Sequence, residues 1–173
     1  FILLAINLIN LIYISKICAD DLTGSKKSNW FWSRPVPTGN MLYSLYFTDH
    51  LTGYAAGSLG TIIKTTDGGK SWITNISNTF QDLSEIFFIN KYEGFTVGSS
   101  GILLKTNDGG KSWSSVASGT NSYLHDITIT ERSTGFCAGL NGTILKSTDK
   151  GNSWKKLISG TSSPLFCLSF LNG

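Results

Sequence analysis

The residues of this chain that could carry chemistry fall into two groups. A Gly-Gly-Lys-Ser stretch stands at 68–71 and again at 109–112, and these residue types can cradle a phosphate. Glu85 and Asp126 stand 41 residues apart, and paired carboxylates are the acid and base of glycoside hydrolysis. His125, beside Asp126, carries a side chain that titrates near neutral pH. The elements that would position these residues decide which chemistry is open to them.

The Gly-Gly-Lys-Ser stretches do not match the motif of a phosphate-binding loop. A phosphate loop has a glycine five residues before the glycine of Gly-Lys-Ser, but Lys64 and Lys105 occupy those places, and the third copy reads Gly-Asn-Ser. Each turn also offers a single carboxylate, whereas a calcium loop needs several oxygen ligands. We therefore expect no metal and no cofactor at these turns.

The turn that contains these glycines belongs to an internal repeat. TTDGGKSW at 65–72 returns as TNDGGKSW at 106–113 and STDKGNSW at 147–154, at an interval of 41 residues. An aspartate can accept hydrogen bonds from amides of its own turn, and a glycine can take a left-handed conformation there. We expect a structural role for the twelve recurring residues Thr65, Asp67, Gly69, Trp72, Thr106, Asp108, Gly110, Trp113, Ser147, Asp149, Gly151 and Trp154.

Each repeat predicts four short strands. The first strands are LYSLYF, LSEIFF, LHDITI and LFCLSF, and the second are GYAAG, GFTVG and GFCAG, with glycines at both ends. The third are TIIKTT, ILLKTN and TILKST, and the fourth begins at each repeated tryptophan. The predicted class is all-β: a partial β-propeller of four-stranded antiparallel blades, with about three complete 41-residue repeats plus flanking partial blades.

The repeated turn resembles the Asp-box, or bacterial neuraminidase repeat, Ser/Thr-x-Asp-x-Gly-x-x-Trp. The longer phrases GYAAGSLGTIIKTTDGGKSW and GFTVGSSGILLKTNDGGKSW resemble the propeller family of the photosystem II assembly and stability factor. This resemblance covers roughly residues 30 to 173, and it implies a chaperone-like role in gripping a newly made membrane protein. Lys27 and Asn29 stand where a box before Trp32 would have Asp and Gly, so that unit departs from the pattern.

The start of the chain predicts export. Residues 1–19 read as a signal-peptide-like segment, because their apolar run is shorter than a membrane span of about 20 residues and contains Asn7 and Asn10. Residues 20–29 read as a linker, and 30–173 as the partial propeller, truncated at its C-terminal end. The predicted location is secreted or periplasmic, without a stable membrane span. Self-association is expected if the chain is not part of a longer propeller.

Binding is the predicted function, and catalysis is the alternative. A sialidase holds its substrate carboxylate with three arginines, whereas this chain has only Arg34 and Arg132. A fragment of an Asp-box glycoside hydrolase, of sialidase or β-glucanase type, or a glycan-binding module remains the alternative. The candidate ligand-facing residues are Glu85, Asp126, His125, Phe80 and Tyr123, which differ between repeats or lie in the loops before them. The expected partner is a protein or a glycan.

The net charge, the recurring lysines and the cysteines do not indicate a further partner or activity. Only 14% of the residues are charged and the net charge is +3, so no basic patch predicts nucleic acid as a partner. Lys64, Lys105 and Lys146 recur in every repeat, which favours a scaffold role in which their stems cover apolar surface between blades while their amines reach water. Cys137 and Cys167 are predicted to be free thiols.

Overall fold

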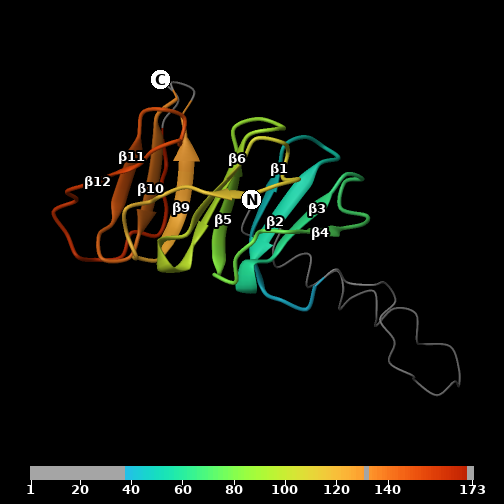
Figure 1. The fold of residues 1–173 in the computed structure, drawn as a ribbon, viewed down its shortest axis with the longest axis horizontal. Helices are drawn as coiled ribbons and strands as arrows, with labels where there is room; N and C mark the ends of the chain where they lie inside the picture. Colours follow the sequence, from blue (N-terminus) through green and yellow to red (C-terminus); the bar gives the residue numbers. More distant parts are fainter. Residues whose placement is uncertain (1–37, 131–132, 171–173) are drawn as a thin grey trace, which may run out of the picture. The chain divides into compact units, whose positions relative to one another are not determined.

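The computed structural model describes residues 38–130 and 133–170. In Figure 1 their strands form three four-stranded antiparallel sheets, each joined in the order of the chain. The strands of the first sheet are β1 (Leu42–Phe47), β2 (Gly53–Gly57), β3 (Ile62–Thr65) and β4 (Ile73–Asn75). The second contains β5 (Leu83–Phe88), β6 (Gly94–Gly98), β7 (Leu103–Thr106) and β8 (Ser114–Ser115), and the third β9 (Leu124–Ile129), β10 (Gly135–Gly139), β11 (Ile144–Ser147) and β12 (Lys155–Leu157).

The predicted all-β fold of propeller blades is confirmed. No helix in the described ranges is long and apolar enough to cross a bilayer. Short 3-10 turns, η1 (Ser58–Gly60) and η2 (Ser99–Gly101), follow the second strands of the first two sheets. The predicted leader, linker and departure from the box before Trp32 all fall on residues outside the described ranges.

Two hydrophobic cores lie between neighbouring sheets. The first core joins Tyr54 and Ile62 of the first sheet to Ile86, Phe88 and other buried residues of the second. The second core joins the second sheet to the third in the same way, through residues that include Phe95, Val97, Ile127 and Leu145. Each sheet therefore depends on its neighbour to bury a face, which is the packing that a stack of blades requires.

The Asp-box turns hold themselves together with local hydrogen bonds. The Asp67 carboxylate accepts from the amide of Ser71 at 2.9 Å and from its hydroxyl at 2.6 Å, while the Thr65 hydroxyl donates to it at 2.7 Å. The Gly69 amide donates to the Thr65 hydroxyl, and Gly69 has φ +86°. The second and third boxes repeat this pattern. The donated hydrogen bonds, first those of Ser71, lower the pKa of Asp67 below its usual range.

The second and third boxes also dock on the blade that precedes each of them. The Gly109 carbonyl accepts from the Tyr54 hydroxyl and from the Lys64 amine, both at 2.8 Å. A Cβ on Gly110 would lie 2.9 Å from the Tyr54 ring, so only glycine permits this approach. In the next pair of blades, a Cβ on Gly151 would lie 2.6 Å from the Phe95 ring. The box is therefore both a hairpin turn and a contact between blades.

The segment at 165–170, predicted to be the first strand of a fourth unit, does not form a strand. It still lies against the third sheet: the Leu165 amide donates to the Gly139 carbonyl, and the Leu168 amide donates to the Asp126 carboxylate at 2.6 Å. Phe170 stacks on Phe136, just as Phe88 stacks on Tyr54 two interfaces earlier. The segment has no paired strand in the described residues, so its backbone lacks the ladder that defines a strand.

Candidate functional site

The strand register places two kinds of loop at opposite ends of each blade. Leu83 at the start of β5 pairs with Gly98, and Phe88 at its end pairs with Gly94, which in turn pairs with Thr106 beside the second box. The boxes therefore lie at the end where first strands finish. The loops that enter the first strands, together with the 3-10 turns, lie at the other end, which we name the entry end.

Three aromatic side chains gather at the entry end of the third sheet. The His125 ring lies between Tyr123 and Phe166, with ring centroids 4.7 and 4.9 Å away. We name Tyr123, His125 and Phe166 the rim cluster. Phe166 is 66% exposed, whereas His125 Nε2 is buried without a hydrogen-bond partner. Burial lowers the pKa of His125 and so favours the neutral form of the ring. The rim cluster therefore combines the exposed apolar ring of Phe166 with a buried ring nitrogen of His125 that has no hydrogen-bond partner.

The two candidate carboxylates are engaged in contacts between neighbouring units. The Ser44 hydroxyl donates to Glu85 at 2.9 Å and accepts from the Ile86 amide at 3.2 Å. Asp126 accepts from the Leu168 amide, and this contact is equivalent to that of Ser44 with the Ile86 amide two interfaces earlier. Burial raises the pKa of Glu85 to about 7; the Ser44 hydrogen bond opposes this shift and the nearby Asp126 charge adds to it. Glu85 and Asp126 therefore both belong to the contacts by which the first strand of one unit packs against the equivalent segment of the next unit.

The pKa of Glu85 predicts how stability changes with pH. Between the usual value of 4.5 and about 7, the unfolded chain has lost this proton while the folded chain keeps it. The contribution of Glu85 to the free energy of unfolding therefore falls as pH rises through this window. Glu85→Gln removes that fall, and at about pH 8 the variant should be more stable than the parent by roughly 2 kcal/mol, with little difference near pH 4.

Urea unfolding followed by circular dichroism at several pH values measures this effect. Glu93→Gln, at a half-buried carboxyl in the β5–β6 turn that accepts from Asn90 of the same turn, is the control and should decline with pH as the parent chain does. An identical decline in Glu85→Gln and in the parent chain would contradict the assignment.

Phe80 is not brought to the rim cluster. It is 88% exposed, and no ring contact joins it to another aromatic side chain in the part of the chain that the structure describes. It lines a groove of about 650 Å³ at the entry end of the first sheet, with Leu59, Asn75 and Ile76. Of the candidate ligand-facing aromatic residues, Phe80 therefore lines this groove and Tyr123 belongs to the rim cluster.

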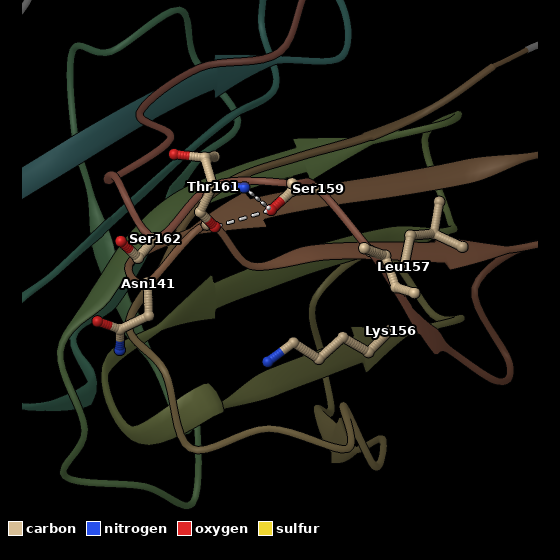
Figure 2. A pocket seen from close by; sticks show the side chains of 9 residues that line it. Asn141, Lys156, Leu157, Ser159, Thr161 and Ser162 are labelled. Atoms are coloured by element: carbon tan, nitrogen blue, oxygen red, sulfur yellow. Dashed lines mark hydrogen bonds between the residues drawn. The ribbon is translucent and has the colours of Figure 1, made fainter.

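A second groove, of about 660 Å³, lies at the corresponding place in the third sheet (Figure 2). Its wall includes Asn141, Lys156, Leu157 and the turn Ser159–Thr161, where the Ser159 hydroxyl donates to the Thr161 carbonyl at 3.1 Å. In Figure 2 the Lys156 amine points toward the side of the groove where Asn141 lies. The sequence did not indicate these grooves, because each is formed by the turn after the second strand and the loop after the fourth strand, which are separated along the chain.

The recurring lysines behave as parts of the scaffold. The Lys64 and Lys105 amines lie 5.1 and 5.4 Å from the Tyr54 and Phe95 ring centroids and donate to atoms of the next box. Sequence reasoning expected these amines to reach water, but in the first two blades they are used between blades. Cys137 is a buried free thiol and Cys167 an exposed one.

The blades, their Asp-box contacts and the loop-lined entry end define the class of protein as an Asp-box β-propeller. The sequence matches the family described as Photosynthesis system II assembly factor YCF48 over residues 24–121. That match spans more than half of the chain, so this chain belongs to the YCF48 family. No protein of curated function matches it.

Solved structures agree with this assignment. A YCF48 bound to a D1 peptide has a TM-score of 0.66 at 25% identity, over 75% of this chain and 44% of that chain. YCF48 from Cyanidioschyzon merolae has a TM-score of 0.63 at 23% identity, over 73% and 42%. An ancestral GH74 enzyme has a TM-score of 0.58 at 17% identity, over 67% and 18%, which shows a shared fold alone. The chain spans less than half the length of either YCF48 protein.

Proposed function

We propose that this chain is a non-catalytic, exported propeller that binds an extended segment of a protein partner at the rim cluster. The observation that supports this most is its similarity to a YCF48 protein that is bound to a D1 peptide. The rim cluster supplies what such a segment needs: exposed aromatic surface from Phe166, which packs on the His125 ring at the end of a rigid blade.

The engagement of Glu85 and Asp126 favours binding over hydrolysis. A glycosidase needs one free carboxylate and one carboxylic acid facing the bond to be broken. Here the Ser44 hydroxyl donates to Glu85 and the Leu168 amide donates to Asp126, and both donors belong to neighbouring units. Turnover of a β-glucan or a sialoside by the purified chain would contradict the non-catalytic proposal. Export has its own test, because residues 1–19 found intact on protein recovered from the periplasm or medium would contradict cleavage of a leader.

The binding proposal predicts that Phe166→Ala weakens peptide binding. Removing an exposed aromatic anchor should lower the affinity for a labelled D1 peptide by about tenfold, which corresponds to about 1.4 kcal/mol. Fluorescence anisotropy measures the affinity directly. Phe166 is largely exposed, so its loss should leave the melting temperature nearly unchanged.

Tyr92→Ala is the matched control, because Tyr92 is 55% exposed and lies beside the second box at the opposite end of the blade. It should bind the peptide as the parent chain does. Equal losses of affinity in both variants, or no binding of the D1 peptide by the parent chain, would contradict the assignment of the rim cluster as the peptide-binding site.

A further inference from the structure

Three apolar side chains line the groove at the entry end of the first sheet and remain largely exposed. Leu59, Ile76 and Phe80 are 61%, 74% and 88% exposed. We name these three residues the first-blade corner. The residues at the equivalent positions of the middle blade, 41 places on, are Ser100, Ala117 and Asn121. Large apolar side chains therefore stand in the first blade where the middle blade has small or polar ones.

Packing between blades does not cover these positions. The middle blade buries one face against the first sheet and the other against the third. Its Ser100, Ala117 and Asn121 are nevertheless exposed, because they lie in the turn and loops at the entry end and not on a face of the sheet. The equivalent residues of the first blade therefore lie where a neighbouring blade on either side leaves them accessible.

The backbone at this corner is strained. Leu59 has φ +54° and Asn78 has φ +59°, in the left-handed region that favours glycine and that a bulky residue such as leucine rarely adopts. In place of Asn78 the other two blades have glycine, and in place of Leu59 they have small or polar residues: Gly119 and Gly160, and Ser100 and Asn141. Strain of this kind is concentrated at binding sites, where the surrounding structure imposes it.

The strained turn is held firmly in place. The Leu59 amide donates to the Asp82 carboxylate at 3.0 Å, and the Gly60 amide donates to the Gln81 carbonyl at 2.9 Å. These bonds fix η1 to the loop that enters β5. The Leu59 side chain is therefore presented by a backbone that is already ordered, which lowers the entropy lost when a partner binds.

The lining of the groove limits the chemistry of its ligand. Among the described residues, the groove is lined by apolar, hydroxyl and amide side chains and by none that is charged. A charged ligand would lose hydration there without gaining an opposite charge. An extended peptide segment offers apolar side chains to Leu59 and Phe80, and its backbone amides and carbonyls can bond to side chains such as that of Asn78.

We propose that the first-blade corner binds an extended, uncharged segment of a partner protein, with an apolar side chain of that segment against Leu59 and Phe80. Exposed apolar and aromatic side chains on an ordered backbone are the usual anchors of such a contact. This site is separate from the rim cluster, which belongs to the third sheet and the segment that follows it.

Fluorescence anisotropy with two labelled ten-residue peptides, blocked at both ends, tests this site. One peptide contains only leucine, serine and glycine, and in the other lysine replaces each serine. The purified 173-residue chain should bind the uncharged peptide about tenfold more tightly than the lysine peptide. Phe80→Asn, which introduces the residue of the middle blade, should weaken binding of the uncharged peptide by about tenfold. Because Phe80 is exposed, its melting temperature should not change.

Leu59→Asn separates a binding role from a structural one. Asparagine adopts a positive φ more readily than leucine, so this variant should melt at the parent's temperature or above it while binding the uncharged peptide less tightly. Ile158→Ser is the matched control, because Ile158 is the fully exposed equivalent of Ile76 in the third blade, and it should bind like the parent chain.

Three outcomes would overturn the proposal: no binding of the uncharged peptide by the parent chain, equal binding of the two peptides, or equal losses in Phe80→Asn and Ile158→Ser. The measurement with the D1 peptide and Phe166→Ala is independent of these outcomes, so either site can fail while the other stands.

Discussion

Gly101→Ala should destabilise the protein by about 3 kcal/mol or more, or prevent folding. Gly101 lies at φ +70°, and a Cβ there would sit 1.9 Å from the Thr120 carbonyl oxygen. That oxygen belongs to the backbone of the loop entering β9, so relief requires the loop to move away from η2. The Ser118 hydroxyl, which donates to the Gly101 carbonyl at 2.7 Å, would lose its partner at the same time.

Gly119→Ala is the control for this prediction. Gly119 has a similar φ, +74°, but nothing lies within 4 Å of a Cβ at that position. Its substitution carries the strain of the left-handed conformation alone, about 1–2 kcal/mol before the gain from a stiffer unfolded chain. Urea unfolding of both variants measures the difference, and equal losses would show that the close approach to Thr120 is not what requires glycine.

Trp113→Ala should lower the free energy of unfolding by about 3–5 kcal/mol, since it removes a large buried side chain from the core between the first two sheets. Trp113 is 4% exposed and packs edge-on against Phe88, with ring centroids 6.0 Å apart. Its Nε1 has no hydrogen-bond partner, so the loss is one of packing. Far-UV circular dichroism in urea is the suitable measurement, because fluorescence changes with the tryptophan content.

Trp72→Ala provides the comparison within the same motif. Trp72 closes the first box but is only half-buried, with Phe47 as its ring neighbour at 6.2 Å. Its loss should cost about 1–2 kcal/mol, because less apolar area returns to water. If the two variants were equally unstable, the tryptophan would act through its own turn and not through the core between blades.

The sequence alone determined the blade and its turn. A strand alternates its faces over a few residues, and an Asp-box turn closes through hydrogen bonds among residues two to four apart, so both are readable from local pattern and a repeat multiplies the signal. That is why the predicted strands of the three complete repeats and the left-handed Gly69 agree with the structure.

Tertiary structure alone decided what meets across blades. Three of these features concern residues about one repeat apart. The Lys64 amine donates to the Gly109 carbonyl, and the Ser44 hydroxyl donates to Glu85. Phe80 and Tyr123 lie in separate places at the entry end. The angle between neighbouring blades decides which residues meet, and a local sequence pattern does not contain that angle. The same reason explains the segment at 165–170: its sequence suits a strand, but a strand forms only where a partner supplies the other half of the ladder.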